Sequence, residues 1–152
     1  MSRPQRASAA GRAYLDLQNR ARREGRSTQE LLTMYVVERW LERLSRSPYA
    51  DDSVLKGGML LAAYGQRRPT ADADALARNL ASDEASVLAR VVEIGSIPGD
   101  DGIEFDEKSA SASTIRDDAL YSGVRVTMTA RLATRPCRSW VIHCRPCSPR
   151  SL

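Results

Sequence analysis

The segment from Ser27 to Leu44 constrains the fold of this chain more than any other stretch of its sequence. It opens with Ser27-Thr28-Gln29-Glu30, a capping box in which the serine oxygen accepts from amides at the helix start and the glutamate reaches back. Apolar residues follow at helical spacing, and three more widen the stripe, so this helix is expected to be buried on more than one side. Ser47-Pro48 is expected to end it. The stripe consists of Leu31, Met34, Val37, Leu41 and Leu44, widened by Tyr35, Val36 and Trp40.

Later segments show the alternation of β-strands instead. Residues 123–132 are the strongest case, since apolar side chains alternate there with arginine and threonine. In "TADADALA" the two aspartates would share one face of a strand and the alanines the other. With brief strands in "SVLKGG" and "DDGIEFDE", and further helices over 8–23 and 82–94, these segments predict an α+β domain. Its N-terminal helices would pack on a small mixed sheet.

The length of 152 residues fits one domain, and charge is distributed unevenly along it. Residues 1–50 hold 10 basic and 5 acidic side chains, residues 51–118 hold 7 and 14, and residues 119–152 hold 6 and none. The acidic middle predicts a carboxylate site, and the basic ends could meet polyanions. Neither a membrane span nor a secretory signal is visible, so a cytoplasmic protein is expected. The expected units are a helical segment at 1–26, a core at 27–134 and an irregular, disordered or out-of-frame tail at 135–152.

A glycine pair and two carboxylates carry the chemistry that this sequence predicts. Asp72 and Asp74, spaced by two on a strand, can share a divalent cation such as Mg²⁺, which prefers oxygen ligands and substrate phosphates. Gly57 and Gly58 lack a Cβ, so their backbone amides can approach a phosphate, and Lys56 adds positive charge. Asp-x-Asp is also common in acidic surface loops and Gly-Gly in turns. The two together, in strand–turn–helix–strand order, favour the functional interpretation.

The segment "LKGGMLLAAYG" followed by "RRPTADAD" resembles the AbiEii/AbiGii-type nucleotidyltransferase toxins, a branch of the DNA polymerase β-like superfamily. The resemblance extends over about Leu15 to Thr134 and implies the fold of that superfamily. It implies that Gly57 and Gly58 hold the triphosphate of an NTP substrate, with Lys56 nearby. Thr70 stands where the family often has a hydroxyl. Asp72 and Asp74 would ligate the two Mg²⁺ ions.

The reaction implied by this resemblance is transfer of a nucleoside monophosphate from the NTP to an acceptor hydroxyl, with release of pyrophosphate. The acceptor in toxins of this type is expected to be RNA, often tRNA. A cognate antitoxin protein is the expected partner. No membrane partner is expected.

The sequence departs from the family in two respects. Small residues, Ala73 and Ala75, stand where the family prefers bulky apolar ones, which predicts a less well-packed strand. A third carboxylate is expected on a later strand, yet no Asp or Glu follows Asp118. Because the last 18 residues are rich in Arg, Pro, Cys and Ser, we hypothesise a shift of reading frame near Thr134 and a truncated product. The alternatives are a non-catalytic antitoxin- or RNA-binding module derived from such an enzyme, and a degenerate fragment without a stable fold.

Other residues have two interpretations each. Glu104 and Asp106 alternate on a strand and could replace the missing ligand, although such residues are more often a solvated strand face. Arg116 and Arg125 could contact RNA phosphate or simply be exposed. A nominal zinc set is present in the tail, although a disordered tail is the simpler expectation. This set consists of Cys137, His143, Cys144 and Cys147.

Overall fold

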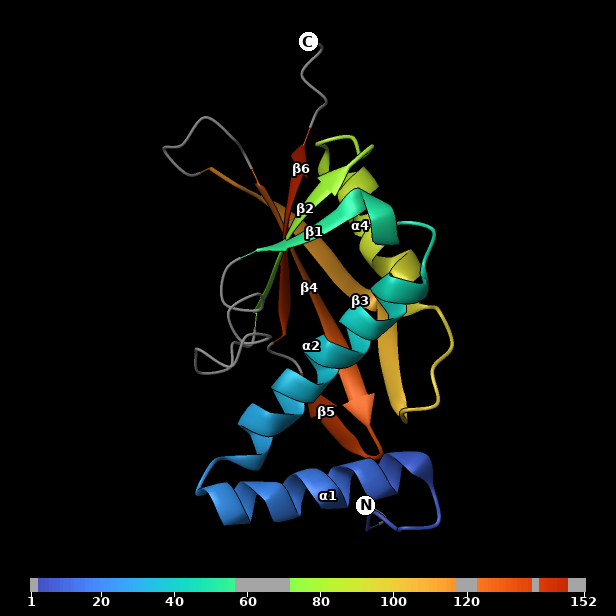
Figure 1. The fold of residues 1–152 in the computed structure, drawn as a ribbon, viewed down its shortest axis with the longest axis vertical. Helices are drawn as coiled ribbons and strands as arrows, with labels where there is room; N and C mark the ends of the chain where they lie inside the picture. Colours follow the sequence, from blue (N-terminus) through green and yellow to red (C-terminus); the bar gives the residue numbers. More distant parts are fainter. Residues whose placement is uncertain (1–2, 57–71, 117–122, 138–139, 148–152) are drawn as a thin grey trace.

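A computed structural model describes residues 3–56, 72–116, 123–137 and 140–147 and confirms the α+β class. Helices α1 and α2 come first, followed by a short 3₁₀ helix. The strands come next, and α4 lies between the second and the third of them (Figure 1). No helix within the described residues is long and apolar enough to cross a membrane. The elements are α1 (Ala9–Glu24), α2 (Thr28–Arg46), η1 (Ala50–Asp52), β1 (Ser53–Lys56), β2 (Asp72–Arg78), α4 (Glu84–Gly95), β3 (Ile103–Ile115), β4 (Gly123–Leu132), β5 (Arg135–Cys137) and β6 (Val141–Cys147).

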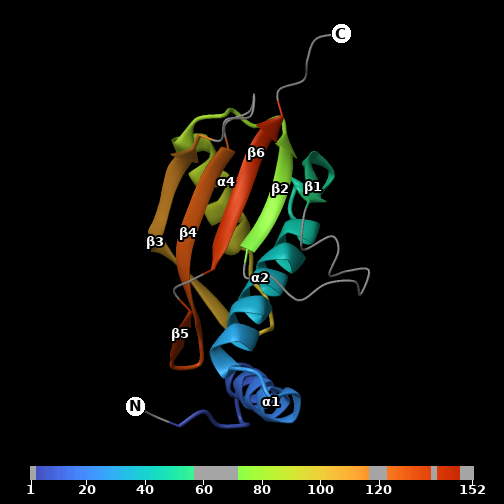
Figure 2. The ribbon, with the colours of Figure 1, turned by 90° about the vertical axis from the view of Figure 1, so that its left-hand side faces the viewer.

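The described strands form one mixed sheet in the order β1-β2-β6-β4-β3, with β5 paired to β4. Strands β2 and β6 run parallel, and each of the other described pairs is antiparallel. Helices α2 and α4 lie on the same side of this sheet (Figures 1 and 2). The opposite side, called the outer face below, carries the polar side chains of β2, β4 and β6. Asp72 and Asp74 belong to it, as predicted.

Helix boundaries follow from the caps that the sequence supplies. Ser8 Oγ accepts from the amide of Gly11 at 3.0 Å and starts α1, and Gly25 ends it in the left-handed conformation (φ 63°). Ser27 Oγ accepts from the Glu30 amide at 3.4 Å, as the capping box predicts. The carboxylate of Glu30 is different from the prediction, since it accepts from Arg26 at 2.6 Å.

The core lies between the sheet and the two helices above it. The predicted α2 stripe is confirmed, with Val36, Val37, Trp40 and Leu44 buried. Trp40 packs near Trp140, with ring centroids 6.4 Å apart. The ring centroid of Phe105 lies 5.3 Å from that of Trp140. Burial of large aromatic rings contributes much of the apolar area that stabilises a domain of this size.

The expectation of an irregular tail is wrong for the described residues beyond Thr134. Residues 135–137 and 141–147 form β5 and β6, and Trp140 and Ile142 are each 1% exposed. The physical reason is position: β6 lies between β2 and β4, so both of its backbone edges have hydrogen-bonding partners despite a composition with low strand propensity. The frame shift near Thr134 concerns the coding DNA and stays a prediction.

Two further boundaries differ from the prediction. Helix α4 begins after Asp83 rather than Ser82, because the Asp83 carboxylate accepts from the Ser86 amide at 2.8 Å. Strand β3 has 13 residues and is longer than the brief strand predicted in "DDGIEFDE". Its serine- and alanine-rich second half pairs with β4 after a register shift between Asp106 and Ser111, so this pairing extends β3 beyond the segment that the sequence predicts.

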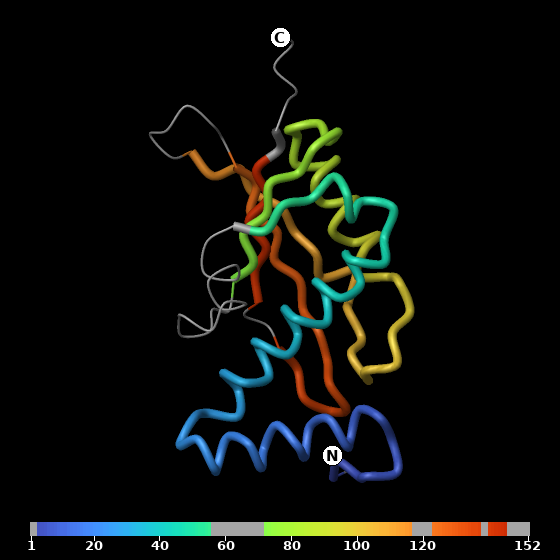
Figure 3. Tube along the Cα trace, in the orientation of Figure 1, coloured from blue at the N-terminus to red at the C-terminus, as the bar shows by residue number. Residues whose placement is uncertain are grey.

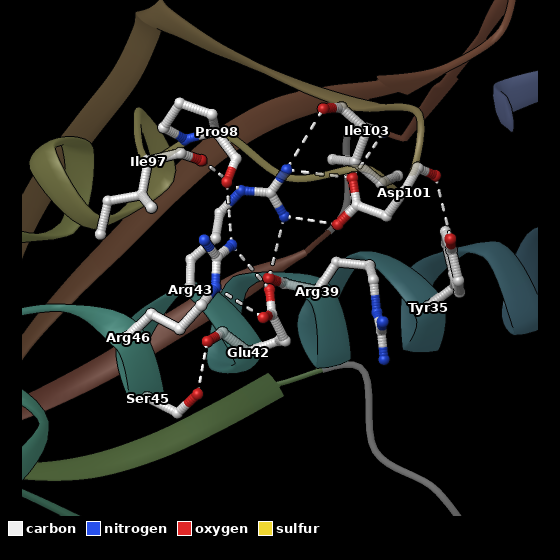
Figure 4. A network of polar contacts seen from close by, with 10 residues as sticks. All are labelled: Tyr35, Arg39, Glu42, Arg43, Ser45, Arg46, Ile97, Pro98, Asp101 and Ile103. Atoms are coloured by element: carbon white, nitrogen blue, oxygen red, sulfur yellow. Dashed lines mark hydrogen bonds and ion pairs between the residues drawn. The ribbon is translucent and has the colours of Figure 1, made fainter.

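A buried ion pair joins α2 to the turn before β3 (Figure 4). Arg43 is 2% exposed and Asp101 is 9% exposed, and the guanidinium binds both carboxylate oxygens, at 2.7 and 3.0 Å. Arg43 also donates to the carbonyl oxygens of Ile97 at 2.8 Å and Arg39 at 3.0 Å. Its donors are therefore satisfied inside the protein, which is the condition for keeping a buried charge.

The same turn holds α1 in place. Tyr35 donates its hydroxyl to the Asp101 carbonyl at 3.0 Å. Gly102 has φ +77°, and a Cβ there would lie 2.3 Å from the Cα of Ala10. Both the conformation and the space therefore require glycine, and α1 packs directly on this backbone. In the Cα trace α1 lies across one end of the molecule, next to the turn between β4 and β5 (Figure 3).

Replacing Arg43 by methionine tests the ion pair. Arg43→Met leaves the Asp101 carboxylate buried without its cation, so the free energy of unfolding should fall by about 3–5 kcal/mol. Urea unfolding followed by tryptophan fluorescence measures this. The matched control is Arg46→Met on the same helix, whose partner Glu42 is exposed, and it should change stability far less. Equal losses in the two variants would contradict a special role of Arg43.

The pH dependence of stability follows from Asp101. Burial acts to raise the pKa of its carboxyl, but the hydrogen bonds from Arg43 and the Ile103 amide outweigh burial and lower that pKa below its ordinary value. A lowered pKa contributes stability that is complete above the unfolded-state value of about 3.9 and is lost as the pH falls through the folded-state value. Asp101→Asn should therefore flatten the acid limb of a stability–pH curve, and an unchanged limb would contradict this assignment.

Cys144 provides a chemical test of the packing of β6. Burial raises the pKa of its thiol to about 11, so the reactive thiolate is scarce at pH 8. Iodoacetamide should leave Cys144 unmodified in the native protein and modify it after unfolding in guanidinium, as read by peptide mass spectrometry. Rapid native alkylation at pH 8 would show that β6 is not packed in the sheet.

Candidate functional site

The Asp-x-Asp pair lies at the start of β2 and faces away from the helices. Asp72 is exposed and Asp74 is half-buried, whereas Ala73, Ala75 and Ala77 are buried beneath α2 and α4. The alternation predicted for this strand is thus confirmed. A small cavity of about 20 Å³ lies between the alanine side of β2 and the helices, so the predicted looser packing takes the form of one water-sized void.

Strand register places three polar side chains in one line across the outer face. Asp74 is the parallel partner of His143 on β6, and His143 is the antiparallel partner of Arg125 on β4. His143 Nδ1 lies 3.1 Å from Asp74 Oδ1, and Arg125 Nε donates to His143 Nε2 at 3.2 Å. We call Asp74, His143 and Arg125 the polar row.

The hydrogen-bond directions in the polar row assign the histidine tautomer. Arginine has no acceptor, so His143 Nε2 must accept from Arg125. A neutral imidazole then carries its proton on Nδ1 and donates it to the Asp74 carboxylate. The row is therefore a directed chain of donors that runs from the guanidinium to the carboxylate.

A second line of pairs lies one step along the same strands. Asp72 is opposite Val141, and Val141 is opposite Thr127. Thr127 Oγ1 and Ser111 Oγ are 2.9 Å apart across β4 and β3. Beyond it, Arg131 on β4 forms an ion pair with Glu104 at 3.0 Å. The outer face thus has carboxylates on β2, a histidine on β6, and arginines and hydroxyls on β4 and its neighbour β3, a surface able to accept both a cation and an anion.

The other predicted phosphate-binding residues fall partly outside the described chain. Lys56, the last residue of β1, is the backbone partner of Asp74 on β2. Its backbone therefore lies beside the aspartates. Gly57, Gly58 and Thr70 lie outside the described residues, and their proposed role stays a prediction.

Glu104 and Asp106 do not lie beside the aspartates. They belong to β3, which is separated from β2 by β4 and β6, and Glu104 is engaged by Arg131. The hypothesis that they replace the missing third ligand is therefore wrong. Within the described ranges, no group of three or more His, Cys, Asp and Glu side chains is arranged to hold a metal ion.

The alternative zinc set is also not assembled. His143 and Cys144 are neighbours on β6, so their side chains point to opposite faces, and Cys144 is buried under α4. Cys137 is buried elsewhere, with its sulfur 3.5 Å from Thr33 Oγ1. The physical reason that the set is not assembled is that consecutive residues of a strand point to opposite faces, so adjacent His143 and Cys144 cannot bind the same ion.

Sequence patterns missed the role of His143. The histidine was predicted only as a zinc ligand of the tail, and Arg125 only as an RNA contact or an exposed residue. The signal that could have found the polar row is the pair Val141-Ile142 before His143, since two β-branched residues favour a strand. Arg116, the other predicted RNA contact, is exposed after the end of β3.

Two hollows lined by described residues lie away from the polar row. One of about 510 Å³ lies beside α1 and is lined by Arg12, Arg20, Arg23 and Tyr35 among others. Another, of about 640 Å³, lies beside α2 near Pro98 and Asp101. Both are broad and open, and none of the predicted site residues lines them.

Comparisons with known proteins found similar folds among solved structures and a family model that matches the segment with the two aspartates. Seven chains among solved structures match this one. One is MenT4, a nucleotidyltransferase toxin from Mycobacterium tuberculosis H37Rv, with 19% sequence identity and a TM-score of 0.50. The match covers 90% of this chain but only 41% of MenT4, so this chain spans less than half the length of that protein. Curated proteins gave no match.

A family model adds to this likeness. The model described as nucleotidyl transferase AbiEii toxin, Type IV TA system, matches residues 39–141. The match covers more than half of the chain and includes β1, β2 and β4. This chain therefore belongs to the AbiEii family of nucleotidyl transferase toxins and has an α+β fold of the polymerase β-like type.

Proposed function

We propose that this chain is a nucleotidyltransferase of a toxin–antitoxin system that transfers a nucleoside monophosphate from an NTP to a hydroxyl of RNA, with tRNA the expected acceptor. The observation that carries the proposal is the position of Asp72 and Asp74 on the outer face, two strands from the exposed Arg125. Carboxylates near arginines suit a substrate that brings both a divalent cation and phosphates.

The residues present fit one Mg²⁺ ion that the protein shares with the nucleotide. Asp72 and Asp74 are hard oxygen donors on one face of one strand, and Mg²⁺ is typically held by one or two carboxylates together with substrate phosphates. When bound there, Mg²⁺ would neutralise charge on the triphosphate and on the departing pyrophosphate. Of the two-metal site that the family resemblance implies, these two aspartates are the part that this chain supplies.

The remaining residues of the site would position the substrates. Lys56, Gly57, Gly58 and Thr70 are proposed to bind the triphosphate, through backbone amides and the lysine charge. On the other side, the Arg125 guanidinium has N–H groups beyond the one that Nε donates to His143, and these suit a phosphate of the acceptor RNA. Positioning of this kind is the larger part of catalysis in phosphoryl-type transfers.

Charge along the chain supports a polyanionic acceptor. The first 50 residues hold twice as many basic as acidic side chains, and the last 34 hold no acidic ones. Such basic surfaces attract RNA, and the affinity falls as salt rises. A cognate antitoxin is the proposed protein partner, and the cytoplasm is the proposed location, because RNA acceptors and NTPs are found there.

Replacing Asp74 or Asp72 by asparagine tests the proposed activity. Either variant removes a carboxylate of the nucleotide site, so transfer of label from an α-labelled NTP to RNA should fall by on the order of 100-fold or more. The matched control is Asp106→Asn, an exposed acid of β3 away from β2, which should leave the transfer rate nearly unchanged. Equal rates in all variants would contradict the assignment of the site.

A second function is favoured by one specific observation. Asp74 already accepts a hydrogen bond from His143, which suits a non-catalytic module that binds the antitoxin or RNA without turnover. Binding of RNA to the wild-type chain, with no transfer of label at saturating NTP and Mg²⁺, would support this alternative over the enzyme.

A further inference from the structure

The strand expected to carry a third carboxylate carries a histidine instead. The family resemblance predicts that ligand on a strand after β4 and close to Asp72 and Asp74. Strand β6 follows β4 and pairs directly with β2, and the residue opposite Asp74 is His143. The position that a third ligand would need is therefore occupied by an imidazole within hydrogen-bonding distance of Asp74.

Neither ring nitrogen of His143 offers a lone pair to a metal ion in this arrangement. Nε2 uses its lone pair to accept from Arg125, and Nδ1 carries the proton that points at Asp74. Metal ligation requires a neutral imidazole with a bare nitrogen aimed at the ion. His143 is thus a hydrogen-bond donor to Asp74, whereas a third metal ligand would have to donate an electron pair.

Charge acts in the same direction. Arg125 is always protonated, and its Nε lies 3.2 Å from the His143 ring. A second divalent cation beside Asp74 on the β6 side would approach this guanidinium, and like charges at such separations repel. The guanidinium already supplies positive charge on the β6 side of Asp74, across the ring of His143.

We infer that this chain holds a single divalent ion, and that the polar row takes the place of a second one. Asp74 is then shared: one carboxylate oxygen is held by His143, and the other side of the carboxylate remains for the ion near Asp72. The inference rests on the proposed function for the placement of that ion at Asp72 and Asp74. It goes beyond it by assigning His143 as a positioning residue and Arg125 as the fixed positive charge.

The histidine tautomer tests the first step on the wild-type protein. His143 is the single histidine of the chain, so its ring nitrogens give an unambiguous ¹⁵N NMR spectrum. In the neutral ring, Nδ1 should appear as the protonated nitrogen and Nε2 as the bare one, and titration with Mg²⁺ should leave Nε2 unprotonated and unligated. The reverse tautomer, or a ligation shift of either nitrogen on adding Mg²⁺, would overturn the inference.

The number of bound ions tests the second step. Mn²⁺ stands in for Mg²⁺, and its paramagnetism allows free and bound ions to be counted by electron paramagnetic resonance without NTP or RNA. Wild-type protein should bind one Mn²⁺ per chain. The double variant His143→Asp, Arg125→Thr places a carboxylate beside Asp74 and removes the cation, so it should bind two.

The matched control is Arg131→Thr, which removes an exposed arginine from the same face of β4 and should leave one ion bound. Circular dichroism checks that each variant is folded, and if the double variant is not, the tautomer of the wild type decides. Two ions in the wild type, or no gain in the folded double variant, would overturn the inference. Two ions in the wild type would leave the proposed function standing.

The same measurements distinguish the inference from the proposed function. One bound ion without any transfer of label to RNA would support the single-ion site and contradict the enzyme. No bound ion in the wild type would contradict both, because the placement at Asp72 and Asp74 would then be wrong.

Discussion

The parallel pairing of β2 with β6 is the interaction on which the rest of the structure depends. Strand β1 is joined to β2, and β3 and β5 are joined to β4, so without β6 the described strands would form two separate antiparallel units. Seven residue pairs, from Asp72–Val141 to Arg78–Cys147, fix the register of this junction. Because side chains alternate with a period of two, that register alone decides that His143 faces Asp74, and a slip of one residue would place Cys144 there.

The identity of the buried side chains explains how a weak strand former can occupy the centre. Ala73, Ala75 and Ala77 are small and buried, and larger residues of α2 and α4, such as Trp40 and Val91, cover this side of β2. The water-sized void that remains costs little, since the loss grows with cavity volume. The alanines therefore keep β2 in the core, and the aspartates between them must face outward. Packing on one side of the strand creates the site on the other.

Much of this arrangement was visible in the sequence, for identifiable reasons. Helix α2, strand β4 and the alternation of β2 were predicted because each has a local pattern that tertiary contacts reinforce. Strand β6 was missed because its stability comes from backbone partners on both edges, and a sequence rich in arginine, proline and cysteine gives no local sign of them. Asp101 lies in the turn before β3, and its partner Arg43 lies 58 residues away and leaves no trace in local patterns. Both features depend on partners that are distant in the sequence, and this is why local patterns did not predict them.

The hydrogen bonds of the polar row limit where a cation can bind on the outer face. A hydrogen-bonded chain from Arg125 through His143 to Asp74 satisfies its own members, so it gains nothing from a second cation placed within it. In the proposed single-ion site, the positive charge that a triphosphate needs would come from one ion at the β2 side and from the Arg125 guanidinium on β4. An ion exchanges with solvent, whereas Arg125 is part of the sheet, so its contribution to such a site would be preorganised before any substrate arrives. A carboxylate at position 143 would reverse this, because it would turn the centre of the row from a donor into an acceptor.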